Sequence, residues 1–126
     1  MTRDQTVRDF LRHRGAAEHV IRGGLEGLVR AWERAVRDVE RGSVDFDDYL
    51  NDADGRQLLE ETLAHVAAER RALVEQRVHA LDERIARHLD EAGECLWGAH
   101  AAREHGWSPA REWWYFRRPA RREEGT

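Results

Sequence analysis

Aromatic and arginine residues gather near the C-terminal end of this chain. Segment 107–122 contains Trp107, Trp113, Trp114, Tyr115 and Phe116, together with Arg111, Arg117, Arg118, Arg121 and Arg122. Tryptophan, tyrosine and arginine dominate protein-interface hot spots because they combine large contact area with a polar group. The same residue types bind single-stranded nucleic acid, with bases on the rings and phosphates on the arginines. A third interpretation is that the aromatics close the open end of a helical core.

Adjacent aromatic residues at 113–116 cannot all face one core, because neighbouring side chains point to different sides of a helix or strand. We therefore expect some of them to be accessible or to be covered by a partner. The candidate anchor residues are Trp113, Trp114, Tyr115, Arg117 and Arg118.

An acidic stretch lies near the middle of the chain. Between Asp38 and Glu61 there are nine acidic residues and two arginines. We expect a polar connector over 43–55, with one helical turn around Phe46, and an N-cap at Asp54. Opposite charge accelerates association, so the stretch predicts a surface for a basic partner or an intramolecular counterpart of the arginines. The candidate partner-binding aspartates are Asp45, Asp47, Asp48, Asp52 and Asp54.

Three residues come closest to a metal site or a nucleophilic site, namely Cys95, His100 and His105. Spacings of five residues place successive side chains on different sides of a helix, so these three converge only if the chain turns. A lone cysteine in a helical stretch is more often a small buried apolar residue. We therefore predict no metal, no cofactor and no catalytic residue. A bundle that binds a metal or small ligand stays as an alternative.

Composition limits the remaining classes of protein. The chain has 126 residues, enough for one domain, with 37% charged residues and a net charge of -4. All 21 basic residues are arginine, which excludes lysine chemistry such as Schiff-base formation. An uninterrupted apolar run of membrane-spanning length is absent from the sequence, and the N-terminal residues are charged. We expect a cytoplasmic protein that does not enter a membrane.

Apolar periodicity predicts the elements that position these residues. A capping-box pattern at Thr2 to Gln5 begins a short helix that ends before Gly15, and residues 16–41 form an amphipathic helix. Residues 56–92 contain neither glycine nor proline and keep one apolar stripe, which predicts a helix of about 38 residues and about 57 Å. Either the shorter helices or a second copy of the chain must cover that stripe, so a homodimer is one of two solutions.

Glycines and prolines mark the remaining features. We expect Gly23, Gly24 and Gly27 to permit close helix packing, with a local break as the alternative. A short helix over 94–105 and an N-cap at Ser108 before Pro109 are expected near the end of the chain. Residues 1–118 form one helical domain in this interpretation, and residues 119–126 form a charged flexible tail.

The sequence therefore predicts an all-α, elongated bundle with one long central helix packed antiparallel on shorter helices and a Trp-rich segment closing one end. The favoured function is a non-enzymatic protein-interaction module. A small acidic helical protein suits inhibition of a basic partner, as antitoxins and immunity proteins do, by analogy of size and charge. Binding of single-stranded nucleic acid through the aromatic and arginine segment is the alternative, although a general nucleic-acid binder is usually basic overall.

Overall fold

A computed structural model describes residues 3–120 of the chain. The elements, in order, are α1 (Arg3–His13), α2 (Glu18–Glu40), α3 (Phe46–Leu63), α4 (Ala68–Ala86), β1 (Leu89–Glu91), α5 (Ala99–His105), the 3-10 helix η1 (Trp113–Tyr115) and β2 (Arg117–Pro119). The predicted all-α bundle is confirmed, with a two-stranded sheet added to it. Thr2 and residues 121–126 lie outside the described residues.

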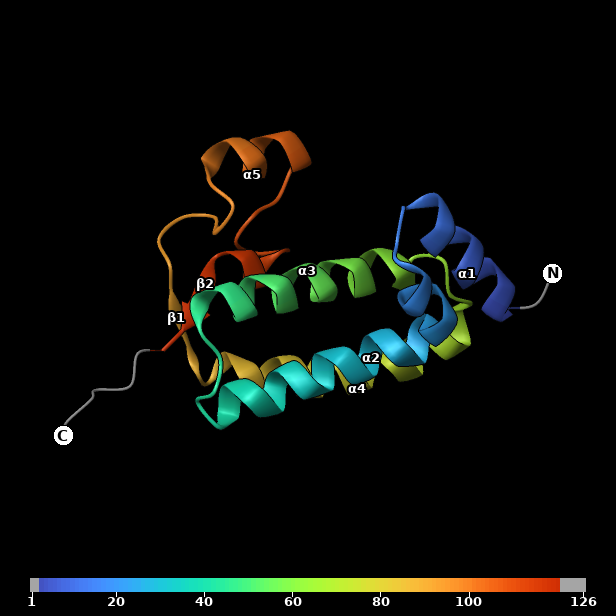
Figure 1. The fold of residues 1–126 in the computed structure, drawn as a ribbon, viewed down its shortest axis with the longest axis horizontal. Coiled ribbons are helices and arrows are strands. Elements are labelled where there is room, and N and C mark those ends of the chain that lie inside the picture. The colour runs from blue at the N-terminus through green and yellow to red at the C-terminus, as the bar shows by residue number, and fades with distance from the viewer. Residues whose placement is uncertain (1–2, 121–126) are drawn as a thin grey trace.

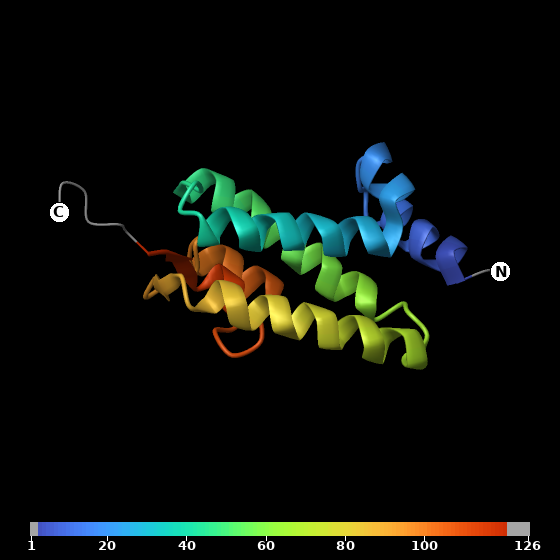
Figure 2. The same cartoon turned by 90° about the horizontal axis from the view of Figure 1, so that it is seen from below.

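Helices α2, α3 and α4 lie along the long axis of the molecule in alternating directions and form its body (Figure 1). The view from below separates α2 and α4, with α3 passing behind them (Figure 2). One continuous core joins the helices because α2 presents an apolar stripe at spacings of three and four to the other two. The buried residues of that stripe are Ile21, Leu25, Leu28, Val29, Trp32, Ala35, Val36 and Val39.

The predicted helix over 56–92 is wrong, because the chain reverses at residues 64–67 between α3 and α4. The turn buries Val66, and the His65 ring stacks on Phe10 with their centroids 4.1 Å apart. Folding back places both halves of the apolar stripe in the same core, where Leu59, Val78 and Ile85 are buried. Tertiary packing therefore overrides a local preference for continued helix.

The reversal also removes the reason for expecting a second copy of the chain. Of the large apolar residues in the stripe, Leu73 is the exposed one, at 69%, whereas the others are buried in the core. Homodimerisation is still a prediction, but an uncovered apolar stripe no longer supports it. Nowhere in residues 3–120 is a helix long and apolar enough to span a bilayer, and the cytoplasmic location stays a prediction.

The glycine prediction for α2 is also wrong. A Cβ added at Gly23, Gly24 or Gly27 would meet no atom within 4 Å, so these glycines do not serve close packing. Gly24 instead has φ 59 and ψ -156 and kinks the helix. The alternative of a local break is confirmed at Gly24, because glycine adopts this conformation without the steric cost of a side chain.

The acidic stretch is helical rather than a connector. Asp45, not Asp54, is the N-cap of α3, and its Oδ1 accepts a hydrogen bond of 2.8 Å from the Asp48 N–H. Asp47 and Asp48 follow in the first turn, where the positive end of the helix dipole stabilises negative charge. The local excess of aspartate therefore begins the helix, which runs directly through the predicted boundary at residue 55.

The C-terminal segment closes one end of the bundle, as predicted. β1 and β2 pair antiparallel, with Leu89 opposite Pro119, and the Leu96 N–H donates to the Tyr115 carbonyl at 2.7 Å. Residues 94–98 are not helical, so the predicted helix over 94–105 is shortened to α5, which stands away from the body on the α3 side (Figure 1). β2 includes Pro119, and most of the predicted tail lies outside the described residues.

Candidate functional site

Two of the predicted anchor residues belong to the core. Trp114 and Tyr115 are 1% and 2% exposed. The Trp114 indole Nε1–H donates to Gln57 Oε1 at 3.2 Å, and the Arg56 guanidinium lies 4.3 Å from the centroid of the Trp114 ring. Tyr49 donates its hydroxyl to the Trp114 carbonyl at 2.8 Å. The structure therefore favours the core-closing interpretation for this pair.

The other predicted anchors also make contacts within the chain. Trp113 is half-buried against the edge of Trp114, and Arg117 lies 5.6 Å from the Trp113 ring centroid. Arg118 is exposed and lies 5.9 Å from the Phe46 ring centroid, beside the start of α3. Arg117 pairs instead with Glu91, with its Nε 3.5 Å from Glu91 Oε1. Of these two arginines, Arg118 is the one beside the acidic start of α3, in the intramolecular arrangement that the sequence left open. Arg121 and Arg122 lie outside the described residues.

The predicted aspartates fall into two groups. Asp45, Asp47 and Asp48 are exposed at the start of α3, whereas Asp52 is half-buried. Burial, with further repulsion from Asp38 and Asp48, raises the pKa of Asp52 to about 6. Asp54 is exposed and occupies a different environment, because aromatic side chains surround it.

A cleft of about 500 Å³ lies over the middle of α3. Its floor comes from Asp54, Gln57 and Leu58, which share one face of the helix because they are spaced by three and four residues. The turn between α1 and α2 forms one wall, through Arg14 and Ala16. The opposite wall comes from the C-terminal region and α5, through Trp97, Ala101, His105, Trp107 and Tyr115.

Asp54 organises the aromatic wall of the cleft. Its Oδ1 accepts a hydrogen bond of 2.6 Å from the Tyr115 hydroxyl and another of 3.0 Å from the Trp97 indole Nε1–H. Burial, together with this bond to the Asp54 carboxylate, raises the pKa of Tyr115. The ring of Tyr115 stacks on Trp107 at 4.2 Å, and Trp107 stacks on His105 at 4.4 Å. Three stacked rings therefore stand beside the carboxylate.

The one arginine in the cleft is already paired. Arg14 donates from Nε to Glu61 Oε1 at 2.8 Å and from Nη2 to Glu61 Oε2 at 3.4 Å. The hydrogen bond with Glu61 and its negative charge raise the pKa of the Arg14 guanidinium. Because this pair is neutral overall, Asp54 sets the sign of the charge at the cleft.

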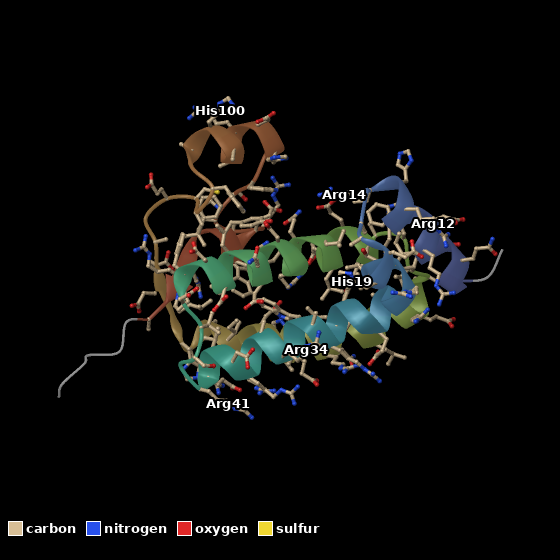
Figure 3. All side chains as sticks on the ribbon, in the orientation of Figure 1. Arg12, Arg14, His19, Arg34, Arg41 and His100 are labelled. Atoms are coloured by element: carbon tan, nitrogen blue, oxygen red, sulfur yellow. The ribbon has the colours of Figure 1, made fainter. Side chains whose placement is uncertain are left out.

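The residues considered for metal binding do not converge. Cys95 is buried, His105 belongs to the cleft wall, and His100 points outward from the far side of α5, opposite the side on which Arg14 lies (Figure 3). Within residues 3–120, no group of three or more His, Cys, Asp or Glu side chains could hold a metal ion. The single cysteine is placed as a small core residue.

Sequence reasoning identified Asp54 and Tyr115 as separate candidates but not the cleft that joins them. No role was assigned to Arg14, Gln57 or Trp97, and Trp107 was named in the aromatic segment but not chosen as an anchor. Asp54, Gln57 and Glu61 are spaced by three and four residues, as on one face of a helix. A prediction that continued the helix through residue 55 would have placed them together. Comparison with protein-family models, with curated proteins and with solved structures finds no match to this chain.

Proposed function

We propose that this chain is a non-enzymatic protein-interaction module that recognises a basic partner along the cleft face of α3. The observation that carries the proposal is the open cleft with Asp54 at its floor, flanked by aromatic rings. Polar and apolar side chains both line this cleft, and a concave site of this size in which aromatic rings flank a charged group is a candidate binding site. The role suits an inhibitor or adaptor, as the antitoxin and immunity-protein analogy suggested.

Charge along α3 supports a basic partner. Asp47 lies seven residues before Asp54, two helical turns away on the same face. Asp47 is exposed, and the neighbouring Asp45 and Asp48 add negative charge at the same end of the helix. A basic segment that runs from the start of α3 to the cleft would meet carboxylates along its length, which accelerates association and favours correct orientation.

The aromatic anchor of this proposal differs from the one that the sequence favoured. Trp114 and Tyr115 are buried, so they support the site from below instead of contacting the partner. Trp97, which is 47% exposed, supplies the accessible ring. The same burial removes most of the stacking surface that binding of single-stranded nucleic acid would need.

A basic peptide provides the test. We would measure fluorescence anisotropy of a labelled nine-residue peptide of alternating arginine and glycine against the wild type, the Asp47→Asn, Asp54→Asn double variant, and Glu69→Gln. Glu69 is an exposed acidic residue in the first turn of α4, away from the cleft face. The double variant is expected to weaken binding at least tenfold at low salt, whereas the single change at Glu69 has little effect.

Two results would count against the proposal. One is a peptide that does not bind the wild type at low ionic strength. The other is a loss of affinity that is the same per charge removed at Glu69 as at Asp47 and Asp54, because this would mean that net charge alone attracts the peptide. A labelled single-stranded oligonucleotide that binds more tightly than the peptide would favour the nucleic-acid alternative instead.

A further inference from the structure

We infer that the cleft over α3 is a recognition site for one arginine side chain of the basic partner, with Asp54 as its carboxylate and Trp97 as its stacking surface. The inference rests on the proposed function for the source of the side chain. The cleft itself supplies the chemistry of the site. Recognition of an arginine side chain requires an available hydrogen-bond acceptor, an accessible aromatic face and a negative local charge.

The available acceptor is Asp54 Oδ2. Both hydrogen bonds that Asp54 receives, from Tyr115 and from Trp97, end on Oδ1, and Oδ2 accepts none among the described residues. An ionised carboxylate has about four acceptor positions shared between its two oxygens. The two donors therefore fix the orientation of the carboxylate and leave one oxygen for an incoming N–H group. Such a preoriented acceptor lowers the ordering cost of binding.

The accessible aromatic face belongs to Trp97. This tryptophan is one of three exposed large apolar side chains among the described residues, at 47%. The residue is not loose, because its Nε1–H is bound to Asp54 and the chain before it is fixed by the buried Cys95. A cation over the face of tryptophan is attracted by the negative potential of the ring. The carboxylate and the ring share a hydrogen bond, so a single cationic group can contact both.

The charges around the cleft favour a cation over an anion. Arg14 is the arginine that lines the cleft, and its bidentate pairing with Glu61 cancels its charge at short range. An anionic ligand would have to break that pair and approach Asp54, whereas a cation needs neither change. The neutral Gln57 amide is already committed, because its Oε1 accepts from Trp114 and its Nε2 donates to Glu61.

Arginine fits these walls better than lysine. A guanidinium is planar, more weakly hydrated than an ammonium, and able to stack on an aromatic ring while its edge donates to a carboxylate. The cleft volume of about 500 Å³ also admits the three-carbon stem, with Leu58 and Ala101 as apolar contacts. The flat wall and the single open oxygen thus match the shape and the donors of this side chain.

The experiment uses small arginine probes and the indole N–H resonances of the full chain. We would titrate Nα-acetyl-arginine N-methylamide into ¹⁵N-labelled protein, with the matched lysine and citrulline compounds as probes. The Trp97 resonance is assigned by its absence in Trp97→Phe. The arginine probe is expected to shift this resonance in a saturable manner. Citrulline, which has the same shape without the charge, is expected to bind at least tenfold more weakly, and lysine at least threefold more weakly.

Variants connect the binding to the two residues. Asp54→Asn and Trp97→Ala are each expected to weaken the arginine probe at least tenfold, with Glu69→Gln unchanged. For Trp97→Ala the indole resonance of Trp107, the other tryptophan that lines the cleft, reports the titration. Because Trp97 is exposed and outside the core cluster, its variant carries the test if Asp54→Asn reduces the melting temperature.

Four outcomes would overturn the inference: an arginine probe that leaves the Trp97 resonance unshifted, equal affinity for citrulline and arginine, equal affinity for lysine and arginine, or full affinity in Trp97→Ala. Its failure is distinguishable from that of the proposed function. A basic peptide that binds along α3 while the arginine probe leaves Trp97 unshifted keeps the function and removes the arginine site. An arginine probe that binds at Trp97 while the basic peptide is not recognised does the reverse.

Discussion

Replacing Asp82 with alanine is expected to cause the largest loss of stability among exchanges of single charged residues in this protein. Asp82 Oδ1 accepts from the Trp32 Nε1–H at 2.9 Å and from Arg56 Nε at 3.1 Å, and Oδ2 accepts from Arg56 Nη2 at 2.9 Å. Arg56 is 4% exposed, and Trp32 is 2% exposed. One carboxylate therefore connects α2, α3 and α4 and satisfies buried donors from two of them.

The expected magnitude follows from what the change leaves behind. Removing one partner of a buried ion pair costs ~3–5 kcal/mol, because the other charge stays buried without compensation. Arg56 keeps Glu60 at 3.0 Å and the face of Trp114, which places the charge penalty at the lower end of that range. The Trp32 N–H loses its acceptor as well, so we expect about 3–4 kcal/mol in total. This is a large part of a typical stability of about 5–15 kcal/mol.

Urea unfolding, followed by tryptophan fluorescence and far-UV circular dichroism, measures the loss. Glu60→Ala is the matched control, because it removes the other partner of Arg56 from a side chain that is 48% exposed, and it should cost less than about 1 kcal/mol. The Arg56→Met, Asp82→Asn double variant leaves no buried charge and keeps an oxygen for Trp32. We expect it to be more stable than Asp82→Ala by about 1 kcal/mol or more.

The expected loss is refuted if Asp82→Ala unfolds within about 1 kcal/mol of the wild type, since the change leaves the buried Arg56 guanidinium with the exposed Glu60 as its ion-pair partner. The assigned cause is refuted if the double variant is no more stable than Asp82→Ala. In that case the loss would come from the packing of the bundle at this position and not from the charge of Arg56.

Gly24→Ala is expected to destabilise the fold by about 1–2 kcal/mol in urea unfolding, because alanine is strained at φ 59. Gly27→Ala should be neutral or stabilising by up to about 1 kcal/mol, because Gly27 lies in regular helix with free space around it. Burial raises the pKa of Asp52 from 3.8 to about 6, so the folded state holds its proton more tightly, and stability should fall as the pH rises through this range. Asp52→Asn, compared with the wild type at pH 4 and pH 7, should match it at pH 4 and be more stable by about 1 kcal/mol at pH 7, once solvent screening of the half-buried carboxyl is allowed for. Asp45→Ala should cost about 1 kcal/mol through loss of the α3 N-cap in thermal unfolding, and a loss below about 0.3 kcal/mol would contradict that role.

The helical class and the amphipathic face of α2 could be predicted from the sequence because both depend on composition and on local periodicity. The reversal at residues 64–67 could not, since residues 56–92 contain neither glycine nor proline. Its cause is nonlocal: Leu63 and Val78 share one core once the chain turns back. The boundaries of α3 were predicted wrongly for a related reason. Its acidic first turn has the composition of a loop, although an aspartate N-cap with further aspartates behind it is also how a helix begins.

The candidate site shows the same division between local and nonlocal information. Chemistry-bearing residues could be selected by type, and Asp54 and Tyr115 were both among them. The two residues that form this hydrogen bond are 61 positions apart in the sequence. The cleft also includes Arg14, from the turn between α1 and α2, and Trp97, from a segment without regular structure. Side chains that meet only through tertiary packing leave no spacing in the sequence. The sequence therefore left the core-closing and the interface interpretations of the C-terminal aromatics open, and Trp114 and Tyr115 were named as candidate anchors although both are buried.

The buried and the exposed aromatic residues belong to one connected structure. Closing the core and lining the cleft are therefore compatible roles for this segment. Tyr115 is in the core, yet its hydroxyl reaches Asp54 Oδ1 and its ring supports Trp107 in the cleft wall. The Trp114 indole N–H donates to Gln57 Oε1, and Gln57 Nε2 donates to Glu61, which is the ion-pair partner of Arg14. Closing the bundle with this segment therefore also fixes the acceptors and the charge balance of the cleft. A rigid core behind a binding site lowers the ordering cost of recognition. Under the proposed function, the segment that completes the fold therefore also orders the cleft for its partner.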